Sequence, residues 1–148
     1  MIRITLTLLA ACVLSACAHV NQESAIYSPS VLNGSREKFH RKIVRVRGYV
    51  TITSNGHTLY ESKSLNAEFR RLWDQESDFD QETFDKYCLT IANPDFFYKN
   101  SELLSGKTII AEGRFIKNYL KDDAIDLGAC PIKTGIIIDT KSIKTVEP

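Results

Sequence analysis

Apolar and polar side chains alternate along several short stretches of this chain, as they do in β-strands that bury one face. The alternation is longest between residues 43 and 53. Its apolar positions are Val44, Val46, Gly48, Val50 and Ile52. The glycine in this series predicts a bend or a bulge in the strand. The strand ends before Asn55-Gly56, a strong hairpin signal, so residues 57–60 are predicted to return beside it as a second strand.

The rest of the pattern predicts further short elements. Apolar residues spaced three and four apart predict an amphipathic helix over residues 64–74, and an acidic run follows it. Between Asn93-Pro94 and Gly106, a short helix is predicted over 95–104, with Phe97 and Leu103 or Leu104 facing inward. Further strands are predicted over residues 87–91, 108–116, 135–139 and 142–146.

The order of these elements indicates a fold. A hairpin is followed by an insertion, a third strand, a single helix and the last strands. One helix between the third and fourth strands is typical of the OB-fold, a five-stranded, partly open Greek-key barrel, and residues 40–146 resemble it. The predicted fold class is therefore mainly β with short helices. We expect an OB-fold-like five-stranded Greek-key barrel with a helical and acidic insertion between strands 2 and 3.

The first residues have the anatomy of a secretory signal. Arg3 precedes about a dozen apolar residues, which is fewer than the roughly 20 that a membrane-spanning helix needs. The next residues, Leu14-Ser15-Ala16-Cys17, resemble the lipobox of bacterial lipoproteins. The resemblance implies that residues 1–16 are removed and that Cys17 carries diacylglycerol and a further fatty acyl chain such as palmitate. The alternative is an ordinary signal cut near Ala18 or His19, with Cys17 unmodified.

The same resemblance implies a location and a domain organisation. Ala18 stands where inner-membrane lipoproteins tend to carry aspartate, which favours attachment to the outer membrane, facing the periplasm. Residues 17–34 are polar with little periodicity, and we interpret them as a lipidated tether. A single domain is predicted over residues 35–148. The chain also resembles small envelope lipoproteins in its Gly48-Tyr49-Val50, Leu59-Tyr60-Glu61-Ser62 and Cys88-Leu89 segments. That likeness implies fold, disulfide and location, but no activity.

Charge is balanced overall and uneven locally. Residues 1–16 contain one basic residue, Arg3, and no acidic one, so the mature chain has equal numbers of basic and acidic residues. A neutral domain in the periplasm argues against nucleic acid as a partner. Residues 36–47 are strongly basic and residues 74–85 strongly acidic. We interpret them as solvated faces that attract each other within the fold, with a partner site as the alternative.

Two cysteines remain once Cys12 leaves with the signal and Cys17 is lipidated. Cys88 and Cys130 are predicted to form a disulfide, because thiols in an envelope compartment tend to be oxidised. Closing the loop between them would stabilise the fold by about 4 kcal/mol in the chain-entropy model. A redox-active pair would stand closer together, as Cys-x-x-Cys.

Patterns that carry catalysis are missing from the sequence. There is no Gly-x-Ser-x-Gly, His-Glu-x-x-His, P-loop or dinucleotide-binding motif, and the three histidines lack metal-ligand spacing. Asp122, Asp123 and Asp126 fall in a Lys/Asp-rich stretch that suits a solvated loop better than a catalytic pair. We therefore expect no catalytic residues, no metal and no cofactor. An envelope hydrolase, or an inhibitor of one, is the weakest hypothesis.

A binding module is the better-supported hypothesis. Arg45, Arg47 and Tyr49 alternate outward on the first strand, and Tyr60 lies on the second, so these four form the candidate binding face. The alternative is that the arginines only keep the surface soluble and the aromatics reflect β-propensity. The function expected is a monomeric, membrane-anchored interaction module whose partner is an envelope protein or a glycan. A glycan- or oligonucleotide-binding OB domain, using the exposed face of strands 2 and 3, is the alternative.

Overall fold

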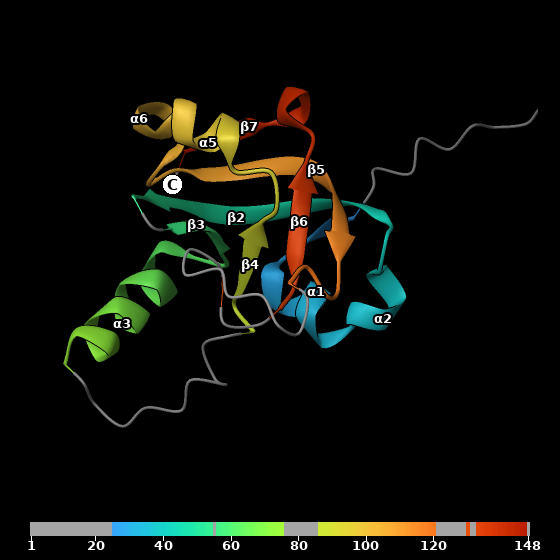
Figure 1. Ribbon diagram of the computed structural model, residues 1–148, viewed down its shortest axis with the longest axis horizontal. Helices are drawn as coiled ribbons and strands as arrows, with labels where there is room; N and C mark the ends of the chain where they lie inside the picture. The colour runs from blue at the N-terminus through green and yellow to red at the C-terminus, as the bar shows by residue number, and fades with distance from the viewer. Residues whose placement is uncertain (1–24, 55, 76–85, 121–129, 131–132, 148) are drawn as a thin grey trace, which may run out of the picture.

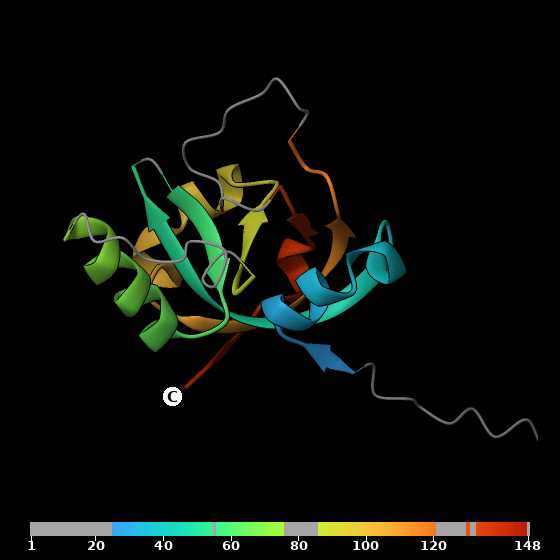
Figure 2. The same cartoon turned by 90° about the horizontal axis from the view of Figure 1, so that it is seen from below.

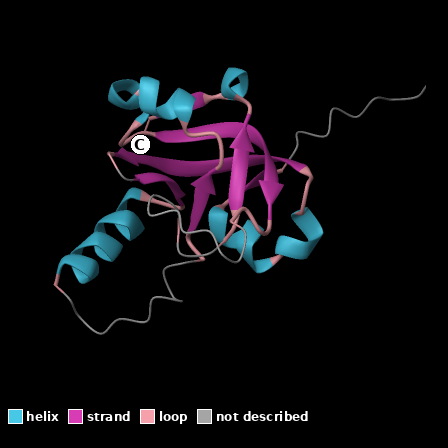
Figure 3. Ribbon diagram, viewed as in Figure 1, coloured by secondary structure: helices cyan, strands magenta, loops and turns pink. Residues whose placement is uncertain are grey.

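The fold is mainly β, with a closed five-stranded barrel and a few short helices (Figures 1 and 3). A computed structural model of the chain describes residues 25–54, 56–75, 86–120, 130 and 133–147. The barrel strands are β2 (Ile43–Thr53), β3 (Gly56–Tyr60), β4 (Cys88–Ile91), β5 (Thr108–Ile116) and β6 (Gly135–Ile138). The strands pair in the order β2-β3-β4-β6-β5, and β5 returns to β2. Only β4 and β6 are parallel among these pairings. The predicted OB-like barrel is confirmed.

Two short strands that are not part of the closed barrel pair with the edges of β2 and β5. β1 (Ile26–Tyr27) pairs in parallel with the first half of β2, and β7 (Lys144–Val146) pairs antiparallel with the first residues of β5. β2 has β5 along one edge; its other edge is shared by β1 and then β3. Figure 2 shows β1 and the end of β7 on the same side of the barrel. The strands β1, β2, β5 and β7 therefore form one continuous sheet on that side.

The glycine in the apolar series of β2, Gly48, lies where β3 approaches closely. A Cβ atom on Gly48 would lie 2.5 Å from Leu59 Cγ and 2.9 Å from the Tyr60 carbonyl oxygen. Real Cβ atoms do not approach other heavy atoms so closely, because repulsion rises steeply below van der Waals contact. Glycine is therefore needed at position 48 of β2, because a larger residue would collide with Leu59 and Tyr60 of β3.

Helices cover parts of the barrel. They are α1 (Pro29–Gly34), α2 (Arg36–Phe39), α3 (Lys63–Asp74), α5 (Asp95–Lys99), α6 (Ser101–Leu104) and the 3₁₀ turn η1 (Thr140–Ser142). The helix predicted over 95–104 is interrupted at Asn100, whose amide nitrogen donates to the Phe96 carbonyl oxygen. Phe97 and Leu104 are buried as predicted, but Leu103 is 70% exposed. The break turns α6 so that only one of its two leucines reaches the core.

The core fills the barrel with apolar side chains from every barrel strand. The inward series of β5 is Ile109, Ala111, Gly113 and Phe115, as predicted from the alternation. α1, α2 and α5 contribute Leu32, Phe39 and Phe97, which are 0%, 5% and 0% exposed. Among the described residues, no helix is long and apolar enough to cross a membrane.

The predicted start of the domain at residue 35 is wrong. Leu32 of α1 is fully buried, and the ring of Tyr27 packs 4.8 Å from that of Phe39. The Ser30 backbone N–H also donates to the Glu61 carboxylate at 3.0 Å. Residues 26–34 look like a tether because one strand of two residues and one helix of six are too short to show periodicity. The domain therefore includes β1 and α1; residues 17–24 lie outside the described residues.

Candidate functional site: a basic sheet face

The outward side chains of β1, β2, β5 and β7 make a basic surface. Registered partners in a sheet share a face, so the pairing places Arg45 between Ile26 and Glu112, and Arg47 opposite Ile110. Ile43 lies opposite Arg114, and Ile110 opposite Lys144. We call this surface the basic face. Its members are Ile26, Ile43, Arg45, Arg47, Ile110, Glu112, Arg114 and Lys144.

The charges of the basic face are not neutralised within the part of the chain that the structure describes. Four cations stand on it with one carboxylate, Glu112. Arg45, Arg47 and Lys144 have no ion pair to any described carboxylate, although Glu112 is the cross-strand neighbour of Arg45. Their charges therefore sum to a positive field over the sheet, which attracts anions.

Open depressions flank the arginines on both sides. Arg47 lines one with residues of β1 and with Glu61 and Lys63, where β1 and β3 diverge along β2. Arg45 lines the other, with side chains of β5, η1 and β7 and with two carboxylates, Glu112 and Asp139. Both depressions include Ile110, so the floor between the arginines is apolar. The face thus offers cations around an aliphatic strip, and no enclosed cavity.

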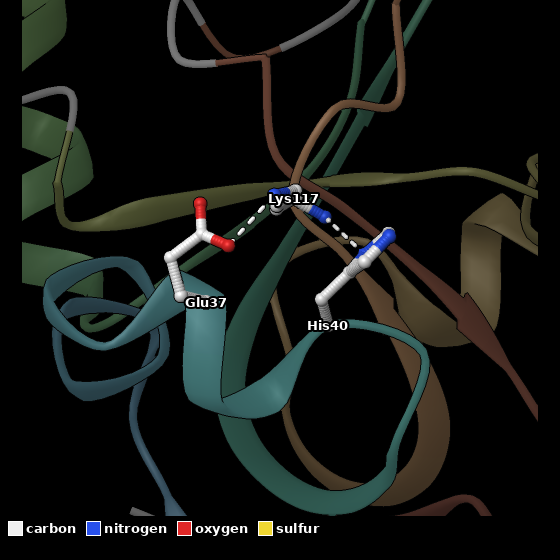
Figure 4. A network of polar contacts seen from close by, with 3 residues as sticks. All are labelled: Glu37, His40 and Lys117. Carbon is white, nitrogen blue, oxygen red and sulfur yellow. Dashed lines mark hydrogen bonds and ion pairs between the residues drawn. The ribbon is translucent and has the colours of Figure 1, made fainter.

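A second basic group lies where β2 begins and β5 ends (Figure 4). The Lys117 backbone N–H donates to His40 Nδ1 at 3.3 Å, and the Lys117 ammonium donates to the Glu37 carboxylate at 2.7 Å. That hydrogen bond lowers the pKa of Glu37 from its ordinary value. Lys117 is therefore paired, whereas Arg41 and Arg114, which line the same depression, have no carboxylate partner among the described residues.

Arg41, just before β2, has an uncommon backbone conformation. Its backbone φ is +63°, in the left-handed region that residues with a Cβ atom rarely adopt. The Arg41 N–H donates to the Phe115 carbonyl at 2.8 Å, and the Phe115 N–H donates to the Lys42 carbonyl at 3.0 Å. These bonds tie the start of β2 to the end of β5 and so keep Arg41 and Lys42 beside the basic face.

The structure separates the four residues that the sequence grouped as a binding face. Arg45 and Arg47 do point outward, but Tyr60 is only 8% exposed and packs with Phe69, Cys88 and Cys130. Tyr49 is half-buried against the same cluster. The reason is the change of partner along β2, which pairs with β1 at Arg45 and Val46 and with β3 from Tyr49 onward. Tyr60 is therefore wrong as a member of an exposed face.

The outer surface of β3 and β4, where an OB-fold commonly receives its ligand, is covered. Thr58, Tyr60, Cys88 and Thr90 are all less than 9% exposed. The predicted disulfide between Cys88 and Cys130 is confirmed, and the Cys130 N–H donates to Thr90 Oγ1 at 3.0 Å. The disulfide thus lies outside the barrel core, in a second small cluster. It fastens residue 130 across the strands that a ligand would otherwise touch.

Two aromatic side chains of α5 are exposed away from the basic face. Phe96 and Tyr98 of α5 are 37% and 38% exposed, and Tyr98 Oη lies 3.1 Å from His57 Nδ1. The acidic residues 122, 123 and 126 and most of the acidic run 74–85 lie outside the described residues.

Arg114 and Lys144 were not among the residues singled out from the sequence. The alternation over residues 108–116 does show that Arg114 points outward, but it does not show that β5 pairs with β2. Among the described residues, no group of three or more His, Cys, Asp or Glu side chains is placed to hold a metal ion. The chain matches no family model, no curated protein and no solved structure.

Proposed function

We propose that this protein is a lipid-anchored binding module of the bacterial envelope, held by acyl chains on Cys17 and binding an anionic partner through the basic face. The observation that carries the proposal is the set of cations on the β1-β2-β5-β7 sheet that have no ion pair to a carboxylate in the described part of the chain. Arg45 and Arg47 have side chains outside the core packing. Charges placed this way contribute little to stability, so their use is in attraction.

The covered surface of β3 and β4 also supports this choice of site. A glycan or an oligonucleotide needs exposed strand faces and aromatic rings on which to stack. Tyr60 is buried here and residue 130 crosses Thr90. The basic face instead combines cations with aliphatic side chains, which suits an anionic surface or an anionic protein partner.

The anchor has a direct test. Protein extracted from membranes should have the mass of a chain that starts at Cys17 and carries diacylglycerol, commonly with a third acyl chain. The Leu14-Ser15-Ala16-Cys17 segment motivates this expectation. A soluble, unmodified chain that begins at Ala18 or later would refute it.

The binding face has a separate test in native envelopes. A photo-reactive phenylalanine at Ile110, on the basic face, should form adducts, whereas the same group at Leu103, which is 70% exposed on α6, should form few. The adducts at position 110 should decline in Arg45→Gln/Arg47→Gln and persist in Arg70→Gln/Arg71→Gln, which removes two exposed arginines from α3. Equal labelling at both positions would contradict the proposed face.

A further inference from the structure

The place where the chain enters the domain brings the basic face close to the anchor. β1 runs parallel to β2 with Ile26 beside Arg45, so the start of β1 lies at the edge of the basic face. Eight peptide steps separate Cys17 from Ala25, and a fully extended chain spans at most about 3.6 Å per residue. The start of β1 therefore stays within about 30 Å of a lipidated Cys17. The domain cannot move away from the membrane as it could on the longer tether predicted from the sequence.

The composition of the face matches a membrane surface. The basic face carries its cations together with Ile26 and Ile43, which are 47% and 60% exposed. Arg41 and Lys42 add two exposed cations beside Ile43. Exposed aliphatic side chains among cations suit the boundary between anionic headgroups and acyl chains.

The short connection to Cys17 and the composition of the face together indicate how the domain is oriented on the membrane, and this inference rests on the proposed lipid anchor. We propose that the basic face lies against the anionic phospholipid headgroups of the membrane that holds the lipids of Cys17. The short connection keeps the face at high effective concentration near that surface, so weak contacts suffice. Each cation next to an anionic surface raises the equilibrium constant for contact between the face and the membrane about fivefold. This attraction extends over about one Debye length.

A lipid surface fits this face better than one folded partner does. The face is a sheet with open depressions, and it lacks a deep pocket for an anchoring side chain. Glu112 on the face, and Glu61 and Asp139 in the flanking depressions, stand among more numerous cations and would not hinder contact with a fluid array of headgroups. The opposite side of the barrel, with α5, would then face away from the membrane.

The test uses the lipidated full-length protein in vesicles, with amine acetylation followed by mass spectrometry. Lys144 reports on the basic face and Lys99 of α5 is the internal control, since both are exposed. Acetylation of Lys144 should be several-fold slower on vesicles that contain phosphatidylglycerol than on phosphatidylcholine alone, and Lys99 should not change. The protection should vanish at high salt. In Arg45→Gln/Arg47→Gln the equilibrium constant for contact between the basic face and the vesicle should fall about 25-fold, from two losses of about fivefold, so Lys144 should lose its protection. Arg70→Gln/Arg71→Gln should behave as wild type.

The outcomes separate this proposal from the anchor on which it rests. Protein that fails to float with either kind of vesicle refutes lipidation at Cys17. Protein that floats with both, but whose Lys144 reacts equally on both, retains the anchor and refutes the membrane-facing orientation. Photo-adducts at Ile110 that contain a protein or a glycan instead of phospholipid would also overturn this orientation, while leaving the binding module intact.

Discussion

Gly48 is the position at which a single added methyl group should do most damage to this fold. The Cβ of Gly48→Ala would sit 2.5 Å from Leu59 Cγ, 2.8 Å from Leu59 Cδ1 and 2.9 Å from the Tyr60 carbonyl oxygen. Leu59 is fully buried, so its side chain has no free space to enter. The Tyr60 carbonyl belongs to β3, which is paired with β2 on one edge and β4 on the other. Both neighbours therefore resist displacement.

The magnitude follows from the two opposing effects. Overpacking a well-filled core costs about 1–3 kcal/mol, and here it acts on side chain and backbone together. The gain in strand propensity from replacing glycine is at most about 1 kcal/mol. We therefore expect Gly48→Ala to lower the free energy of unfolding by about 2 kcal/mol, and Gly48→Val to lower it further.

Urea unfolding with the disulfide intact measures this loss. With a slope of about 2 kcal/mol per molar urea, the midpoint should fall by about 1 M at unchanged slope. Gly34→Ala is the matched control, because a Cβ there meets nothing within 4 Å. That substitution should be neutral or stabilise by up to about 1 kcal/mol. If both variants unfold at the midpoint of the wild type, the close approach of β3 at Gly48 is not a constraint on the fold.

Three further predictions test the domain boundary, the disulfide and the ion pair. Leu32→Ala should lower the free energy of unfolding by about 2–5 kcal/mol, whereas Val31→Ala, at an exposed position, should change it little. Equal, small effects would restore residues 17–34 as a tether. Replacing Cys88 and Cys130 by alanine should cost about 2–5 kcal/mol in the same assay, and peptide mapping without reductant should recover one bridged pair; two alkylatable thiols would rule out the bond. The pKa of Glu37 is lowered by the Lys117 hydrogen bond, so its contribution to stability is present above its ordinary pKa of 4.5 and is lost as pH falls through the lower folded value. An NMR titration of the Glu37 carboxyl should show this lowered pKa and its return toward 4.5 in Lys117→Met; an unchanged pKa in that variant would refute the assignment.

Local features of the barrel could be predicted from the order of the residues. The alternation over residues 43–53 and 108–116 identified two strands and their inward residues, because side chains in a strand alternate strictly between the two faces. Gly48 marked the close approach of β3, since an isolated glycine in an apolar series indicates such an approach. The disulfide between Cys88 and Cys130 could be predicted because those cysteines had no other pairing choice once the N-terminal pair was assigned to the signal and the lipid.

The tertiary structure alone decided which side chains share a surface. Tyr60 alternates as an outward residue, yet it is buried, because Cys130 and Phe69 cover that side of β3 from distant parts of the chain. Arg45 and Arg114 are far apart in sequence, and only the pairing of β2 with β5 sets them on one face. Strand periodicity reports which face a side chain occupies, but it carries no information on which strand lies beside it. Closure of the barrel supplies that information, and the basic face is its consequence.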